Sequence, residues 1–159
     1  MTGVFGRDVR MRTSRPKTPV IYDASTSFTV GGSQTVRSSA SDTVTLVGAG
    51  ITLFECLAAH EMLKTQGVTA RVIDLYCLQP VDTATLQKAA KETGVIVTVE
   101  DHYPAGGLGE AVMSAVAPVG GKVHQLAVRS LPRSGKPEEL VDKFGLSARH
   151  IVEAVKAHL

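Results

Sequence analysis

The chain reads VEDHYPAGGLGEAV from Val99 to Val112. An apolar run, Val95–Val99, ends there in three polar residues, and a Gly-Gly-x-Gly turn then leads into an apolar pattern of helical period. This order predicts a buried strand, a loop that carries an acid and an imidazole, and a helix. In open α/β sheets, ligands and partner domains bind at the carboxyl ends of the strands. We therefore expect Glu100, Asp101 and His102 to lie at such an edge.

The alternation of strand and helix continues outward from this stretch. Short β-branched runs predict strands near 44–48, 70–75, 95–99 and 123–128, and apolar patterns of helical period predict helices near 51–64, 82–93, 108–116 and 147–159. Strands joined by helices form parallel pairs. The sequence thus predicts an α/β fold, a three-layer α/β/α sandwich around a mostly parallel sheet of about five strands. An antiparallel edge strand from residues 1–41 is compatible with this pattern, and 20–22 is one short candidate.

Several residues have the form of helix caps. Thr52 and Glu55 have the T-x-x-E spacing of a capping box, and Asp82 and Ser147 precede two of the other helical patterns. Gly67 and Gly94 are predicted to end the first two helices.

The chain divides near residue 42. Residues 1–41 carry a net charge of +4 and are rich in Ser, Thr and Gly without helical period. Such a segment cannot bury a core alone. We predict an N-terminal extension or linker at 1–41 and one α/β domain at 42–159, a size that suits a single core.

Composition excludes several classes of partner. The net charge of +2 is too small to predict nucleic acid or an anionic membrane as a partner, and no apolar run approaches the ~18 residues of a membrane-spanning helix. No signal-peptide pattern opens the chain. Cys56 and Cys77 lack metal-ligand spacing and sit among apolar residues, so we expect free thiols and a cytoplasmic location.

A turn at Gly48-Ala49-Gly50 has some features of a dinucleotide site. It follows a predicted strand, opens a helix, and is followed one βαβ unit later by Asp74. Leu53 occupies the place of the third glycine of G-x-G-x-x-G. We favour a tight strand-to-helix turn, and keep a small nucleotide- or dinucleotide-binding module as the alternative.

The strand-end residues Glu100, Asp101 and His102 have two interpretations. They could act as an acid–base group, or they could satisfy a hydrogen-bond network at an interface, which we favour. The glycines that follow, Gly106, Gly107 and Gly109, fit a turn better than an anion-binding nest.

Two basic stretches complete the candidate sites. Arg12-Thr13-Ser14-Arg15-Pro16 places two guanidinium groups beside two hydroxyls, a combination that could hold phosphate or carboxylate. Residues 129–137 form a second basic loop without the GxxxxGK[ST] frame of a P-loop.

Five motifs together resemble the C-terminal part of a transketolase, close to the animal-type enzymes. In chain order they are R-T-S-R-P from Arg12, V-T-L-V-G-A-G from Val44, V-E-D-H-Y from Val99, G-G-L-G-E-A-V from Gly106 and P-R-S-G-K-P from Pro132. The resemblance covers Arg12 to Leu159 and leaves out residues 1–11. The β subunit of a 2-oxo acid dehydrogenase and deoxyxylulose phosphate synthase end in related domains, but the first and third motifs favour transketolase.

The resemblance implies a function that this chain shares with other domains. Transketolases are cytoplasmic homodimers that move a two-carbon ketol unit between sugar phosphates, with thiamine diphosphate and Mg²⁺ or Ca²⁺. Their cofactor motif, G-D-G followed by an asparagine, is absent from this sequence. The resemblance implies no catalytic, cofactor-binding or metal-binding residue in this chain. It implies one substrate-binding residue, Arg12, which matches the family arginine that binds the phosphate of the sugar substrate. The domain would serve assembly, and the chain alone would be inactive.

Overall fold

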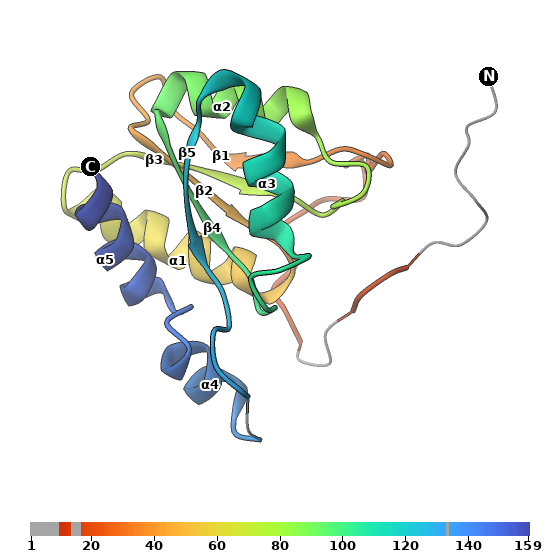
Figure 1. The fold of residues 1–159 in the computed structure, drawn as a ribbon, viewed down its shortest axis with the longest axis vertical. Helices are drawn as coiled ribbons and strands as arrows, with labels where there is room; N and C mark the ends of the chain where they lie inside the picture. The colour runs from red at the N-terminus through yellow and green to blue at the C-terminus, as the bar shows by residue number, and fades with distance from the viewer. Residues whose placement is uncertain (1–9, 14–16, 133) are drawn as a thin grey trace.

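A five-stranded mixed sheet forms the centre of the molecule in the computed structural model, which describes residues 10–13, 17–132 and 134–159. The strand order is β1-β3-β2-β4-β5 (Figure 1). The strands are β1 (Gln34–Arg37), β2 (Val44–Gly48), β3 (Ala70–Asp74), β4 (Val95–Val99) and β5 (Lys122–Leu126). All neighbouring strands are parallel except β1 and β3.

Helices cover both faces of this sheet. They are α1 (Ile51–Thr65), α2 (Thr83–Thr93), α3 (Leu108–Val116), α4 (Pro137–Lys143) and α5 (Ala148–His158), with a 3₁₀ turn η1 (Ala117–Val119) after α3. Figure 1 shows α1 and α5 on one face, and α2 and α3 on the other. The predicted three-layer α/β/α sandwich is therefore confirmed.

The sheet separates two apolar cores because successive strand residues point to opposite faces. Leu46 and Val72 pack under α1 and α5, whereas their neighbours Val47 and Ile73 pack under α2 and α3. The parallel strands are buried on both faces, which explains why their sequences are continuous apolar runs rather than alternating ones.

The antiparallel edge strand comes from the N-terminal part of the chain. Gln34 pairs with Asp74 and Thr35 with Ile73, and a bulge follows before Arg37. The edge strand is therefore β1 and not the candidate at 20–22, which lies outside regular structure. The division at residue 42 stays a prediction.

The helix caps predicted from the sequence are confirmed only in part. Asp82 caps α2 by accepting a hydrogen bond from Thr85 N–H at 3.1 Å, as predicted, and α2 ends at Gly94. The capping box at Thr52 is wrong, because α1 begins after Gly50 and Thr52 lies inside the helix. Ser147 precedes α5, but its hydroxyl bonds to Asp142 instead of capping the backbone.

None of the helices in the described residues has both the length and the apolar composition that crossing a bilayer requires.

Candidate functional site

Glu100 is the best-defined polar residue at the carboxyl end of the sheet. It follows β4 directly and is only 4% exposed. Its Oε2 accepts a bond from Leu108 N–H at 2.7 Å, and its Oε1 accepts bonds from Gly109 N–H at 2.9 Å and Gln125 Nε2 at 2.7 Å. The carboxylate thus satisfies the first two N–H groups of α3, where the helix dipole also favours a negative charge.

Two of the following glycines are explained by this arrangement. A Cβ on Gly107 would lie 1.8 Å from Oε2 of Glu100, and a Cβ on Gly109 would lie 2.5 Å from Nε2 of Gln125. Both positions require glycine because the carboxylate and its amide partner fill the space. The G-G-L-G motif therefore lets a helix N-terminus approach the strand-end carboxylate.

Asp101 and His102 point to other partners. The Arg12 guanidinium donates through Nη2 to Asp101 Oδ2 at 2.8 Å and to the Asp101 carbonyl at 3.2 Å. His102 is exposed, and its Nδ1 lies 2.8 Å from the Tyr103 carbonyl. The three strand-end residues thus form no single acid–base group: one caps a helix, one holds an arginine 89 positions earlier, and one lies at the surface.

A second buried carboxylate, Asp74, ends β3. It is 6% exposed, and its Oδ2 accepts a hydrogen bond from the Tyr22 hydroxyl at 2.7 Å. Its other oxygen, Oδ1, has no partner among the described residues. Burial raises the pKa of Asp74, and the bond from Tyr22 offsets part of that rise. Burial and the neighbouring Asp74 raise the pKa of Tyr22, which keeps the phenol a donor.

Tyr22 also begins an aromatic cluster that we call the strap cluster: Tyr22, Phe28 and Tyr76. Phe28 packs edge-on against both tyrosines with ring centroids 5.0 Å apart in each pair. The segment around residues 20–32 is held against the end of β3 by these rings and by a bond from Gly31 N–H to Cys77 Sγ at 3.1 Å. Asp74 therefore anchors an N-terminal strap.

The Gly48-Ala49-Gly50 turn shows the tight geometry that we favoured. A Cβ on Gly48 would lie 3.0 Å from the backbone of Thr52 and Leu53, and Gly50 has φ +59°. Thr52 Oγ1 donates to the Val99 carbonyl at 2.8 Å, between the ends of β2 and β4 where a doubly wound sheet would admit a ligand. With Asp74 bound to Tyr22, nothing in this geometry favours the dinucleotide alternative.

The two basic stretches are described in part. In R-T-S-R-P, residues 14–16 lie outside the described residues, as does Arg133 in the second loop. Arg12 is exposed and held by Asp101, whereas Arg129 donates to the Gln125 carbonyl at 3.1 Å.

Ligands for a metal do not gather in the described residues. No three His, Cys, Asp or Glu side chains there lie together as a metal cluster would need. Glu100 has its oxygens bonded to protein donors, and both cysteines are free thiols, with Cys56 fully buried. These residues therefore do not fit a metal ion that is bound to a diphosphate, and no catalytic step on thiamine diphosphate is assigned to them.

Sequence reasoning missed two participants of the site. Gln125 and Tyr22 complete the networks of Glu100 and Asp74 from 25 and 52 positions away. Gln125 carried one weak signal, since it is a polar residue within a predicted strand. Tyr22 had only its place in a predicted extended segment.

These features define a doubly wound α/β domain whose strand-end carboxylates serve the structure of the domain. The family described as "Transketolase, C-terminal domain" matches residues 33–151. The chain belongs to the transketolase C-terminal domain family.

Animal transketolases and their relatives are similar to this chain. It is 54% identical over 148 residues to Transketolase-like protein 2 of Mus musculus, and 47% identical over 148 residues to Transketolase of Rattus norvegicus. Each match covers 92% of this chain but 24% of the relative. The chain thus spans about a quarter of the length of these relatives.

Solved structures show the same fold. A split-gene transketolase, solved as an inactive β4 tetramer, has a TM-score of 0.84 and 33% identity, over 90% of this chain and 47% of that one. Transketolase from Campylobacter jejuni has a TM-score of 0.62 and 19% identity over 89% of this chain and 20% of that one, which supports the fold alone.

Proposed function

We propose that this chain acts as the C-terminal domain of a thiamine diphosphate-dependent transketolase, and that it completes and stabilises the enzyme's homodimer without catalysing alone. The observation that carries the proposal is the state of Glu100. The carboxylate best placed for chemistry at the sheet edge accepts three bonds from the domain's own donors. A group so engaged holds a helix in place instead of moving protons.

Exposed apolar residues on the strap support a role in assembly. Val20 is 91% exposed and Val30 is 77% exposed, and Phe28 of the strap cluster is half exposed. An apolar surface of this kind on a small domain is typical of contact with another protein surface. We infer that the strap packs against the remaining domains of the enzyme, in the same polypeptide or in a separate one.

Arg12 is the residue that we propose for substrate binding. It would hold the phosphate end of the sugar substrate, as the resemblance to the family implies. Its side chain is 63% exposed, and its two hydrogen bonds to Asp101 both use Nη2. Since a guanidinium carries five N–H donors in a fixed fork, the Asp101 contact orients the group and leaves donors for a phosphate.

The rest of the proposed setting follows from family membership. In the full enzyme, thiamine diphosphate and Mg²⁺ or Ca²⁺ would be held by other domains, and the reaction would be ketol transfer between sugar phosphates of the pentose phosphate pathway. We propose a cytoplasmic location, in agreement with the two free thiols.

A coupled ketol-transfer assay on the 159-residue chain tests the proposal. With thiamine diphosphate, Mg²⁺ and a donor and acceptor pair of sugar phosphates, we expect no turnover above the protein-free blank. Robust turnover by the chain alone would refute the proposal. Calorimetry with NAD and ATP addresses the nucleotide-binding alternative, for which micromolar binding would be the supporting result.

A further inference from the structure

A hollow lies beside β5, which is the edge strand on the opposite side of the sheet from β1. Among the described residues β5 pairs with β4 alone, which leaves its other edge without a neighbouring strand. Between this strand, its continuation to Ser130, and α4 and α5 is a cavity of about 560 Å³. The hollow is open to solvent on one side.

Basic side chains predominate among the charged groups that line the hollow. β5 and its continuation contribute His124 and Arg129, and α4 contributes Lys143. α5 contributes His150, His158 and Glu153, the last being the one acid among the described lining residues. Of the basic groups, His150 lies 3.7 Å from Asp142. Within the described residues, Arg129 and Lys143 form no ion pair. Uncompensated positive charge in a recess attracts anions.

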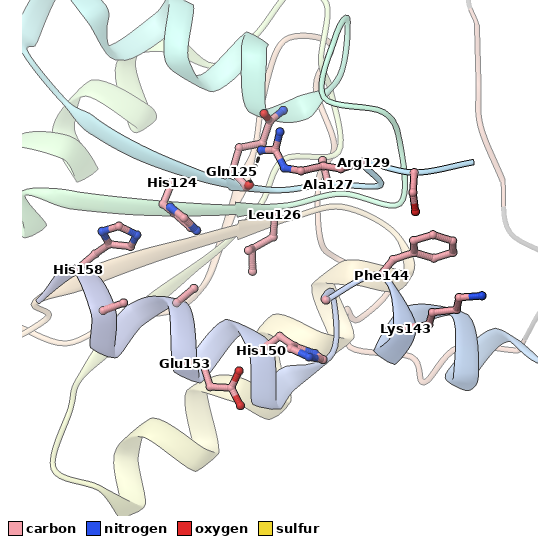
Figure 2. Close-up of a pocket in the computed structure, with 14 residues that line it drawn as sticks. His124, Gln125, Leu126, Ala127, Arg129, Lys143, Phe144, His150, Glu153 and His158 are labelled. Carbon is pink, nitrogen blue, oxygen red and sulfur yellow. Dashed lines mark hydrogen bonds between the residues drawn. The ribbon is translucent and has the colours of Figure 1, made fainter. Parts of the chain in front are cut away.

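Two histidines meet inside the hollow. The rings of His124 and His158 have centroids 4.2 Å apart and are tilted by 41°. Figure 2 shows these two side chains facing each other across the gap between β5 and α5. Burial, followed by the charges of His158 and Arg129, lowers the pKa of His124, and a bound anion would favour its protonated form.

The remaining wall is apolar. Leu126 points from β5 toward α5 (Figure 2), and Ala154 and Ala157 line the helix side. A ligand that fits both parts of the wall has an acid group at one end and an apolar body at the other.

We propose that this hollow, which we call the β5 pocket, binds a small organic anion: a phosphate or carboxylate group lies against His124, His158 and Arg129, and an apolar body lies on Leu126, Ala154 and Ala157. The pocket is separate from Arg12, so the inference does not depend on the transketolase proposal. It gives the domain a binding function on the edge of its sheet.

Phenyl phosphate is a suitable probe, because it carries both parts of the proposed ligand. Histidine ring signals of the 159-residue chain can be followed by NMR during titration, with inorganic phosphate and phenol as the two halves. We expect saturable shifts of His124 and His158 with a Kd of about 1 mM or below for phenyl phosphate, and weaker binding of each half. His60 and His102 lie outside the pocket and should not shift.

The variant Arg129→Gln sharpens the test, since Arg129 is exposed and its replacement should leave the fold intact. We expect the Kd to rise about tenfold through loss of a charge-assisted contact. Lys88→Gln is the matched control, because Lys88 is an exposed cation on α2, outside the pocket.

Three results would overturn the proposal. The first is the absence of saturable shifts at His124 and His158 with phenyl phosphate. The second is an equal loss of affinity in Arg129→Gln and Lys88→Gln. The third is a shift that follows protein concentration instead of the probe, which would show that the open edge of β5 pairs with a second copy of the chain.

Discussion

Glu100 and Asp74 are both buried carboxylates at the ends of strands that flank β2, yet their surroundings differ. Glu100 accepts three hydrogen bonds that engage both of its oxygens. Asp74 accepts one from Tyr22, and its Oδ1 has no partner in the described part of the chain. Glu100 thus holds the domain's own core together, whereas Asp74 holds a strap that comes from the N-terminal segment.

The difference shows how one kind of residue serves two purposes in a single sheet. Backbone N–H groups at a helix start are fixed, so a carboxylate bonded to them is a permanent part of the fold. A single tyrosine on an exposed segment is a weaker tie, and the bond can be lost when that segment moves. Removing the hydrogen bonds of Glu100 should therefore lower the stability of the whole domain. Removing the hydrogen bond between Tyr22 and Asp74 should loosen the strap alone.

The largest effect is expected for Gly107→Val. The new Cβ would lie 1.8 Å from Glu100 Oε2, so the carboxylate must leave the helix N-terminus. We expect the free energy of unfolding to fall by about 3 kcal/mol, measured by urea denaturation. Gly106→Ala is the control: Gly106 has φ +71° and open space around it, so backbone strain of about 1 kcal/mol is all that it should cost. Equal losses in the two variants would contradict the role of Glu100.

Glu100→Gln should have the next largest effect. It keeps the shape of the side chain but replaces one acceptor oxygen with a donor facing N–H groups. We expect a loss of about 2 kcal/mol, because buried donors at the start of α3 would be left without partners. The control is Glu110→Gln, since Glu110 is an exposed acid that accepts from Gly106 N–H on the same turn and should cost below about 1 kcal/mol. A smaller loss for Glu100 than for Glu110 would be the adverse result.

A smaller effect is expected for Tyr22→Phe. It removes the hydrogen bond from the Tyr22 hydroxyl to Asp74, with an expected loss of about 1 kcal/mol of stability. The pKa of Asp74 should rise further, because that bond lowers it. Hydrogen exchange should show faster exchange at Thr29 and Gly31 while α3 stays protected. Tyr103→Phe on an exposed tyrosine is the control. Loss of protection throughout the sheet would argue against a strap that opens by itself.

The pH dependence of stability distinguishes the two carboxylates further. The raised pKa of Asp74 means that the folded chain holds this proton to higher pH than the unfolded chain does. Its contribution favours folding below the unfolded pKa of about 3.9 and is lost as the pH rises through the folded pKa. We expect Asp74→Asn to lack this loss.

The measurement is the difference in unfolding free energy between wild type and Asp74→Asn as the pH rises from about 4 to about 7. A difference is needed because Asp82 and Asp142 have lowered pKa values and act in the opposite sense. A difference that does not change with pH would contradict the account of Asp74.

Arg12→Ala should have the smallest effect on stability. Its ion pair with Asp101 is exposed, and such pairs contribute between about 0 and 1 kcal/mol. Its effect on substrate should be much larger in an assembled transketolase. We expect a higher KM for phosphorylated acceptors and little change for unphosphorylated ones, and equal losses for both would count against a phosphate role.

Local patterns were enough to predict much of the fold. The limits of β4 and α3 follow from an apolar run, a glycine turn and a helical period, which lie next to one another in sequence. α4 is absent from the predicted helices, although Pro137 at its first turn, followed by Glu138 and Glu139, is a pattern typical of a helix start. β1 is short and half-exposed, so no periodic pattern marks it, and only its pairing with β3 makes it a strand.

The sequence predicts where in the fold the site lies, but not which distant residues contact it. The sequence predicts Glu100 at the strand end and favours for it a hydrogen-bond network at an interface, whereas the structure bonds it to donors of its own domain. Its partner Gln125 and the Arg12–Asp101 pair depend on contacts between distant parts of the chain. The β5 pocket lies between β5, α4 and α5, which follow one another along the chain, and no local pattern reports how these three elements pack together.

A chimera tests the central claim most directly, namely that this chain supports an active centre whose reactive groups lie in other domains. The C-terminal domain of rat transketolase, to which this chain is 47% identical, is replaced by this chain, and ketol transfer is measured with thiamine diphosphate and Mg²⁺. We predict a dimeric, active chimera, with activity that is lost in Gly107→Val together with the dimer. A chimera that folds and dimerises but transfers no ketol unit would contradict the claim.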